Sequence, residues 1–231
     1  MTITVYEELE QGSDEWLALR CGTLTAGSTK LIMTPTGKPA SNDKERAHMW
    51  ELAAQRITGY IEPSFLGDEM IRGLEDEITV REIYAARFGP VVQVGHVTND
   101  GFGFTMGYSP DGLIGDDGMI EIKSRRQRFH AELLITGIVP DEFIPQMQAG
   151  MMITGRKWCD FCCFCGGMPF TPIRVYADPV YQENVLNIAT AFEARLQAAV
   201  QQYHDRMALL DGTGQLIQTE RRVDPGDEIT V

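Results

Sequence analysis

The residues Ser109-Pro110-Asp111-Gly112, followed by Glu121-Ile122-Lys123, decide the fold of this chain. Alternate residues of a strand face the same side, so Glu121 and Lys123 are expected to point into one site while Ile122 turns toward the core. The Pro-Asp-Gly sequence predicts a turn that carries Asp111 to the same site. Mg²⁺ prefers oxygen ligands and usually takes one or two protein carboxylates, a role that Asp111 and Glu121 fit. Two acids neutralised by a lysine are the alternative, because such short patterns arise often by chance.

The rest of the chain is predicted to form one α/β domain. Its 231 residues, 43% of them hydrophobic, suffice for one sizeable core, and no low-complexity stretch divides them. We expect a single domain over residues 1–210 and a polar tail over residues 211–231. The sequence shows no signal peptide and no apolar run long enough to span a membrane. A cytoplasmic protein without a membrane partner is therefore expected.

Hydrophobic periodicity, capping residues and turn signals predict helices and strands along the whole domain. Ser13 is expected to cap the first helix, and Gly89-Pro90 to end the third. In that third helix the apolar residues are expected on the buried face: Ile71, Leu74, Ile78 and Ile83. Helices are predicted over residues 13–20, 42–58, 68–88, 127–137, 141–154 and 179–210, and strands over residues 91–98, 103–108, 118–123, 157–165 and 171–177.

The net charge of −13 argues against a DNA enzyme, since proteins that bind phosphates usually carry a basic surface. The basic residues are unevenly placed, however, and four of them lie together at the predicted site: Lys123, Arg125, Arg126 and Arg128. Cations at the start of a helix oppose its dipole by about 0.3 to 1 kcal/mol each, and an anionic ligand would offset that cost. A phosphate site is therefore favoured over a solvated basic turn.

Four of the five cysteines lie in one run, CDFCCFC at residues 159–165. Residues 157–165 have the length and aromatic content of a buried strand, whose alternation would send the thiols to opposite faces. Free cysteine packs there as a small hydrophobe. An iron–sulfur cluster with Cys21 as a distant ligand is the alternative, and a disulfide framework is not expected in a cytosolic chain.

Five motifs, taken in order, resemble the phage lambda exonuclease and its YqaJ-like viral recombinase relatives. They are QGSDEWLALRCGTLTA at residues 11–26, Gly73-x-x-x-Glu77, Ser109-Pro110-Asp111-Gly112, Glu121-Ile122-Lys123 and Gln146-Met147-Gln148. The match covers roughly residues 10–165. It implies the PD-(D/E)xK nuclease fold, a central mixed β-sheet flanked by helices. It also implies an enzyme of phage or prophage origin that digests one strand of linear double-stranded DNA from 5′ to 3′ and leaves a 3′ single-stranded overhang for homologous recombination.

The resemblance assigns roles around the metal. Asp111 and Glu121 would bind it together with the backbone carbonyl of Ile122, and Glu77 would be a further ligand or an acceptor for water at the metal. Two Mg²⁺ ions per site are implied, for which Mn²⁺ can substitute. Lys123 would orient or deprotonate the attacking water, and sequence leaves open which of these it does.

Two helical residues take their roles from the resemblance alone. Gln146 would fix the attacking water, although an amide on a helix is more often a surface residue. Met70 would be an apolar wedge that parts the two DNA strands, since a flexible thioether can enter a base stack. Without the resemblance, Met70 is expected in the core.

The resemblance further implies a pocket for a 5′-terminal phosphate. Arg20 can fork onto phosphate oxygens, and it would be joined by Ser109 and by one of Arg125, Arg126 and Arg128. The family's Thr-Ala-Ser becomes Thr25-Ala26-Gly27-Ser28 in this chain. The serine hydroxyl expected at Gly27 is therefore missing or displaced to Ser28.

The implied partners are double-stranded DNA ends, a single-strand annealing protein and two further copies of the chain in a ring-shaped homotrimer. Three other functions stay open: a related endonuclease, an iron–sulfur nuclease, and a non-catalytic acidic protein that mimics DNA. The charge of −13 favours the last of these. The presence of Asp111, Glu121 and Lys123 speaks against it, because a binding module needs no such set.

Overall fold

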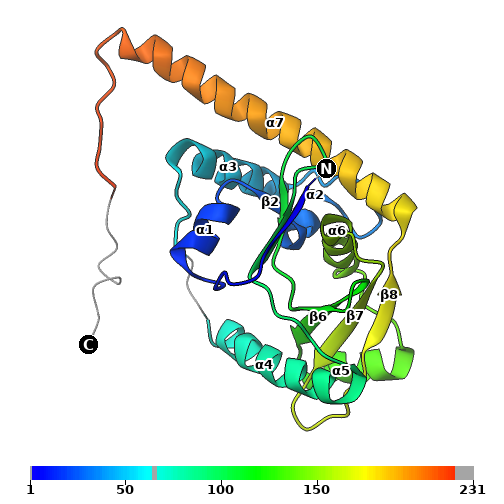
Figure 1. Cartoon of the computed structure of the whole chain (residues 1–231). Helices are drawn as coiled ribbons and strands as arrows, with labels where there is room; N and C mark the ends of the chain where they lie inside the picture. The colour runs from blue at the N-terminus through cyan, green and yellow to red at the C-terminus, as the bar shows by residue number, and fades with distance from the viewer. Residues whose placement is uncertain (1, 64–66, 222–231) are drawn as a thin grey trace, which may run out of the picture.

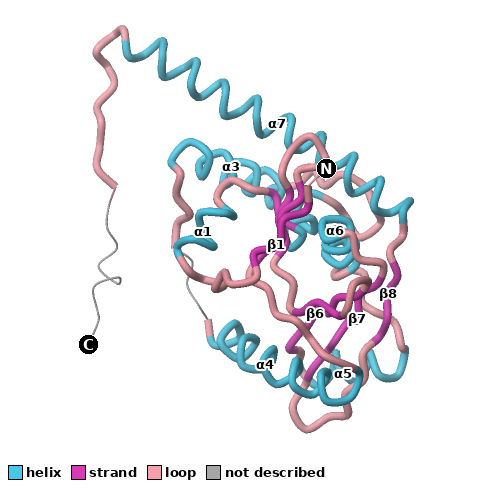
Figure 2. Tube along the Cα trace, viewed as in Figure 1, coloured by secondary structure: helices cyan, strands magenta, loops and turns pink. Residues whose placement is uncertain are grey.

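Two four-stranded β-sheets, with helices between and around them, make up the fold (Figures 1 and 2). The computed structural model describes residues 2–63 and 67–221, without the side chains of residues 68–70. Residues 109–111 join the two sheets, because they leave a strand of the first and enter a strand of the second. The predicted α/β class is confirmed, and the central sheet expected from the resemblance takes the form of two sheets.

The first sheet runs in the order β1 (Ile3–Tyr6), β3 (His96–Asn99), β4 (Met106–Tyr108) and β2 (Leu24–Thr25). The pairs β1–β3 and β3–β4 are antiparallel, whereas β2 joins β4 in parallel. Neither β1 nor β2 is among the strands predicted from sequence. Ile3 and Val5 of β1 alternate with Thr2 and Thr4, but the strand has only four residues, and β2 has only two.

The second sheet runs in the order β5 (Gly112–Ile114), β6 (Gly118–Ser124), β7 (Trp158–Phe164) and β8 (Ile173–Tyr176). β6 and β7 are parallel, and the two outer pairs are antiparallel. In the parallel pair, Glu121 lies beside Phe161 and Lys123 beside Cys163. This register places the predicted active-site residues in the middle of a buried sheet.

The helices begin and end largely where their caps predict. The Ser13 hydroxyl accepts a hydrogen bond from the Trp16 N–H at 3.2 Å, which starts the helix Asp14–Arg20, and Gly59, with φ of 64°, ends the helix Asp43–Thr58. The elements are α1 (Asp14–Arg20), a 3₁₀ turn η1 (Ala26–Ser28), α2 (Thr29–Ile32), α3 (Asp43–Thr58), α4 (Asp68–Phe88), α5 (Gln127–Thr136), α6 (Ile144–Thr154) and α7 (Pro179–Asp211).

Helix α4 has the predicted bounds, but the predicted buried face is wrong. Its Val80 and Tyr84 pack against Ile120 and Ile122 of β6. The Tyr84 hydroxyl also donates to Asp160 Oδ2 at 2.6 Å, which fixes the rotation of the helix. The four residues predicted as buried are 38–56% exposed: Ile71, Leu74, Ile78 and Ile83.

The main core lies between the two sheets, where α6 and α7 also contribute buried side chains such as Met147 and Phe192. Helix α3 packs beside α7 and is tied to it by Arg56, whose guanidinium pairs with Glu193 at 2.6 and 2.8 Å. In Figure 1 the C-terminal part of α7 extends past the other helices. Among the described helices, none combines the length and apolarity needed to cross a membrane.

Candidate active site

The link between the two sheets carries the Asp111 carboxylate onto β6. Asp111 Oδ2 accepts a hydrogen bond from the backbone N–H of Ile122 at 2.6 Å. The Ile122 side chain packs under α4, so its neighbours Glu121 and Lys123 face the other side of the sheet. The structure thus brings Asp111, Glu121 and Lys123 together in the arrangement that strand alternation predicts.

Glu121 is the most deeply buried of these groups, with 1% of its surface exposed. The Tyr108 hydroxyl donates to its Oε2 at 2.8 Å, and Lys123 Nζ lies 2.5 Å from its Oε1. Within the described residues, Oε1 has this ion pair but no hydrogen bond of regular geometry. Tyr108 was not predicted from sequence, because its contact with Glu121 depends on how the two sheets meet.

The acids and the lysine strongly influence one another. Burial and the nearby Glu121 carboxylate raise the pKa of Asp111 well above its usual range, and Lys123 only partly opposes this. Burial disfavours the charged form of Lys123, but Glu121 and Asp111 outweigh it and hold the Lys123 pKa above its usual value. Lys123 therefore keeps its proton when no metal is present.

Glu77 approaches the same site from α4. Arg81 Nη1 lies 3.6 Å from Glu77 Oε2 and also donates to the backbone carbonyl of Asp111 at 3.3 Å. Arg81 thus connects the helix to the link between the sheets. Burial raises the pKa of Glu77, and Arg81 and Lys123 partly offset this. Sequence analysis missed Arg81, although its position four residues after Glu77 on a helix was a usable signal.

The residues fit a divalent cation. Three carboxylates, from Asp111, Glu121 and Glu77, interact electrostatically with one another and with two cations, Lys123 and Arg81. With all three ionised, the site would carry one more negative than positive charge in a largely buried place, a cost that raises the pKa of Asp111 and Glu77 and that a metal ion would offset. No group of three or more His, Cys, Asp or Glu side chains among the described residues is arranged to hold an ion by itself. Mg²⁺ suits such a site because it keeps several waters and needs few protein ligands.

The two glutamines of α6 differ in their surroundings. Gln146 is half-buried and forms no hydrogen bond with any described residue, so its amide is available. Gln148 is buried and holds the chain at the start of α7: its Nε2 donates to the Tyr176 carbonyl at 2.9 Å, and its Oε1 accepts from the Asp178 N–H at 3.0 Å. Of the two, only Gln146 has an amide that could contact a substrate.

Arg20 belongs to a separate group that we call the Arg20 cluster, formed with Trp16, His96 and Ser109. The Arg20 guanidinium stacks on the Trp16 ring at 4.0 Å. The Ser109 hydroxyl accepts from Trp16 Nε1 at 2.9 Å and lies 2.9 Å from His96 Nδ1. Among the described residues no carboxylate pairs with Arg20, so its guanidinium, stacked on Trp16, could pair with an anionic ligand.

Gly27 leaves room for the serine that the resemblance implies at this position. A side chain at Gly27 would meet no atom within 4 Å, and the backbone there is not left-handed. The neighbouring Ser28 is engaged locally, since its hydroxyl donates to the Thr25 carbonyl at 2.9 Å and accepts from the Thr25 N–H at 3.1 Å. Ser28 therefore serves first as a cap of the turn η1.

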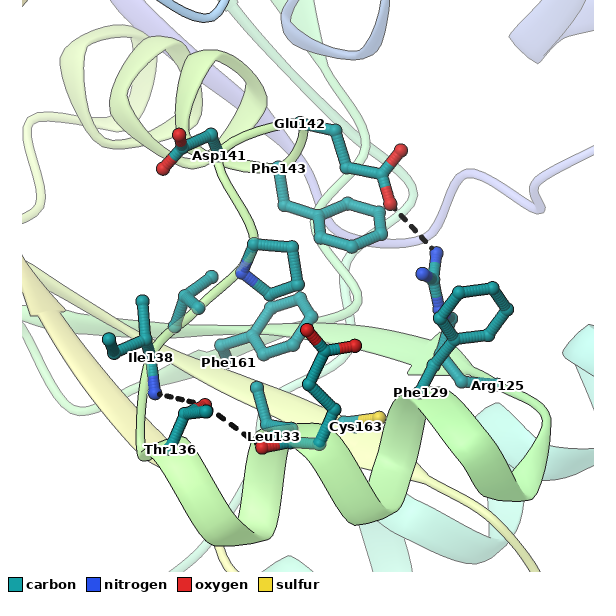
Figure 3. A pocket seen from close by; sticks show the side chains of 13 residues that line it. Arg125, Phe129, Leu133, Thr136, Ile138, Asp141, Glu142, Phe143, Phe161 and Cys163 are labelled. Carbon is teal, nitrogen blue, oxygen red and sulfur yellow. Dashed lines mark hydrogen bonds and ion pairs between the residues drawn. The ribbon is translucent and has the colours of Figure 1, made fainter.

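The three arginines that follow β6 have different partners. Arg125 Nη1 donates to Glu142 Oε1 at 3.0 Å, a pair visible in Figure 3. Arg128 stacks on the Phe129 ring at 4.3 Å, and Arg126 is exposed at the N-cap of α5. All three border a hollow of about 560 Å³ to which Arg72 of α4 also contributes. Four arginines and one acid, Asp76, therefore line this hollow.

Two other predicted features can be located. Met70 lies in the first turn of α4, and its side chain is outside the described part of the chain. Cys159, Cys162 and Cys163 are buried in β7 as free thiols, and Cys162 faces α4 while the other two face the main core. Burial raises the pKa of each of these thiols.

Comparison with known protein families identifies the YqaJ-like viral recombinase domain, whose profile matches residues 15–157. Among solved structures, an alkaline exonuclease from Laribacter hongkongensis, LHK-Exo, is similar at 33% identity and a TM-score of 0.77. The match covers 86% of this chain and 100% of that one. The same exonuclease in complex with dAMP matches at 34% identity with the same coverage and TM-score.

A phage-related exonuclease from Haemophilus somnus 129PT shares the fold at lower similarity. Its TM-score is 0.56 at 14% identity, over 78% of this chain and 96% of that one. A search of curated proteins gave no match.

Proposed function

Because the chain belongs to the YqaJ-like viral recombinase family, we propose that it is a Mg²⁺-dependent exonuclease that digests one strand of linear double-stranded DNA from the 5′ end. The observation that carries this proposal is the meeting of Asp111, Glu121 and Lys123 on one face of β6. The similarity to an alkaline exonuclease over its full length supports the same class of reaction.

The reaction is hydrolysis of a phosphodiester by in-line attack of water. When bound, Mg²⁺ would lower the pKa of the water that it binds and neutralise negative charge on the phosphate. Asp111 and Glu121 would hold the ion, with the Ile122 carbonyl and Glu77 beside them, and Tyr108 keeps the Glu121 carboxylate oriented. Mn²⁺ is expected to substitute for Mg²⁺, and two ions per site are part of the proposal.

Lys123 and Gln146 would act on the attacking water. Lys123 holds its proton in the arrangement seen here, so we assign its ammonium to orienting the water and stabilising phosphate charge. The amide of Gln146 is unengaged by the described residues and can hold the same water. Arg81 keeps Glu77 and the Asp111 backbone at a fixed separation.

The direction of digestion would come from the Arg20 cluster. A 5′-terminal phosphate can accept two hydrogen bonds from the Arg20 guanidinium, which Trp16 holds in place. Ser109 lies in this cluster and is two residues from Asp111, so an end bound here is close to the carboxylates. The basic hollow at the start of α5, with Arg125, Arg126 and Arg128, would bind further phosphates.

The biological setting we propose is phage-type recombination in the cytoplasm of a bacterial host. The 3′ overhang would be passed to a single-strand annealing protein, and three copies of the chain would form a ring around the duplex. The family match supports this proposal. Sedimentation velocity would check the trimer.

Digestion of linear duplex DNA, labelled at either the 5′ or the 3′ end of one strand, tests the proposed reaction. With Mg²⁺, the 5′ label should appear at once in short products while the 3′-labelled strand shortens gradually; EDTA should stop both. Asp111→Asn serves as the inactive control. Cutting of a closed circular duplex would identify an endonuclease, and early release of the 3′ label would reverse the proposed direction.

A further inference from the structure

A cavity of about 420 Å³ lies beside the catalytic residues, between α5 and the segment that leads into α6 (Figure 3). Phe161 and Cys163 of β7 form its floor. They are the register partners of Glu121 and Lys123, and paired strands are only about 4.8 Å apart. The cavity therefore opens on the same face of the sheet as the catalytic groups and directly next to them.

Arg125 and Phe143 stand between the cavity and the catalytic residues. The Phe143 ring lines the cavity and is also 5.9 Å from Lys123 Nζ, so it forms a shared wall. Arg125 follows Lys123 by two residues and is stacked between Phe129, at 4.4 Å, and Phe143, at 5.1 Å. Its pair with Glu142 holds the guanidinium at the mouth (Figure 3).

The lining of the cavity combines flat apolar walls with a few acceptors. Aromatic and aliphatic side chains such as Phe129, Phe161 and Leu133 supply most of the surface. Arg125 is the only cation among the lining residues, whereas three carboxylates lie around it: Glu132, Asp141 and Glu142. A phosphate would be repelled from the interior and attracted to the mouth. A nucleobase has a flat apolar ring and amino groups that carboxylates can accept from.

We propose that this cavity binds the base of the terminal nucleotide during its removal, while the two phosphates of that nucleotide lie at the Arg20 cluster and at the carboxylates. The volume lies within the range of about 300 to 1,000 Å³ that small-molecule pockets occupy. The position of the cavity identifies a base as its ligand, because a strand whose phosphate reaches Lys123 must place a neighbouring base within reach of Phe143. This inference rests on the proposed exonuclease function and names a subsite within it.

The test uses 2-aminopurine deoxyribonucleoside 5′-monophosphate, whose fluorescence is quenched when its base stacks on an aromatic ring. Ile138→Trp would fill the cavity, since Ile138 lines it and is 67% exposed. Ile135→Trp is the matched control, because Ile135 is 85% exposed and is not a lining residue. Thr136→Trp is a second, independent variant that would fill the cavity, because Thr136 lines it from the end of α5.

Wild-type protein should bind the nucleotide with quenching, and both filling variants should weaken binding by at least about fivefold, the lower limit for loss of one base–aromatic stack. Ile135→Trp should bind like wild type. Deoxyribose 5-phosphate, which lacks the base, should bind more weakly than the nucleotide and equally to all four proteins.

Equal nucleotide affinity in wild type and both filling variants would overturn the proposal. So would deoxyribose 5-phosphate binding as tightly as the nucleotide, or no quenching of the wild-type mixture at millimolar nucleotide. These measurements involve no cleavage. Failure of the exonuclease function would instead appear as intact duplex in a parallel digestion with Mg²⁺, so the two failures can be told apart.

Discussion

Replacement of Lys123 by alanine would leave a buried carboxylate without its cation. Glu121 is 1% exposed, and its Oε1 lies 2.5 Å from the Lys123 ammonium. Removing one partner of a buried ion pair typically costs about 3 to 5 kcal/mol. The Lys123 side chain is 28% exposed, so water already screens part of the attraction and the lower end applies. We expect the free energy of unfolding to fall by about 3 kcal/mol.

Urea unfolding with and without Mg²⁺ would measure this loss. The difference between Lys123→Ala and wild type should be largest without metal and should shrink as Mg²⁺ is added, because the ion replaces the missing positive charge. Digestion of DNA should fall by about 100-fold or more, the usual contribution of a group that acts on the attacking water. DNA binding supported by Ca²⁺ should be largely retained.

Lys157→Ala is the matched control for this variant. Its ammonium pairs with Asp117 at 2.9 Å, but the two side chains are 73% and 52% exposed. Such a surface pair contributes less than about 1 kcal/mol. If Lys123→Ala were as stable as this control without metal, the buried pair would not support the fold. Hydrolysis near the wild-type rate would remove Lys123 from the mechanism.

Four other substitutions address the remaining parts of the site. Glu121→Ala should lower both Mg²⁺ affinity and cleavage, and an unchanged metal titration by calorimetry would show that Glu121 is not a ligand. Arg20→Ala should abolish the preference for 5′-phosphorylated over 5′-hydroxyl duplex. A charge-assisted hydrogen bond is worth about 1.5 to 3 kcal/mol, or about 10- to 150-fold in rate. Equal rate ratios for wild type and Arg20→Ala at one salt concentration would exclude Arg20 from the pocket. Gly27→Ser should fold normally and raise the same rate ratio by about 2- to 12-fold, the value of a neutral hydrogen bond, whereas an unchanged ratio would place the terminal phosphate elsewhere. Burial and the charge of Arg20 lower the pKa of His96 to about 4. Between about pH 6.5 and 4 the unfolded chain binds a proton that the folded protein does not, so the free energy of unfolding should decrease by up to about 3 kcal/mol as the pH is lowered through that window. Urea titrations of His96→Asn should show a flatter pH dependence.

Element bounds were more predictable than element orientation. The bounds of α4 follow from local signals such as Gly89-Pro90, which act within a few residues. Its rotation follows from tertiary contacts, because Tyr84 is fixed by Asp160 on a distant strand. The apolar row that periodicity assigned to the core, including Ile78, is exposed instead.

In the candidate site, too, relations within one strand were predictable from sequence, whereas relations between elements were not. Strand alternation predicts that Glu121 and Lys123 share a face, since that relation is a property of β6 alone. The roles of Tyr108 and Arg81 depend on where β4 and α4 come to lie against β6, which no local pattern contains. The short strand β5 was also missed, because only three residues separate the turn at Asp111 from the next turn.

The link between the two sheets has a fixed length. Ser109 belongs to the Arg20 cluster and Asp111 to the carboxylates, and only Pro110 separates them. Two residues of chain span at most about 7 Å, which is close to the interval between successive phosphates along one DNA strand. Proline, whose φ is locked by its ring, keeps that interval from stretching. If the terminal phosphate is bound at Ser109 as proposed, one nucleotide would fit before the scissile bond, and the length of this link would set the step by which the protein advances along DNA.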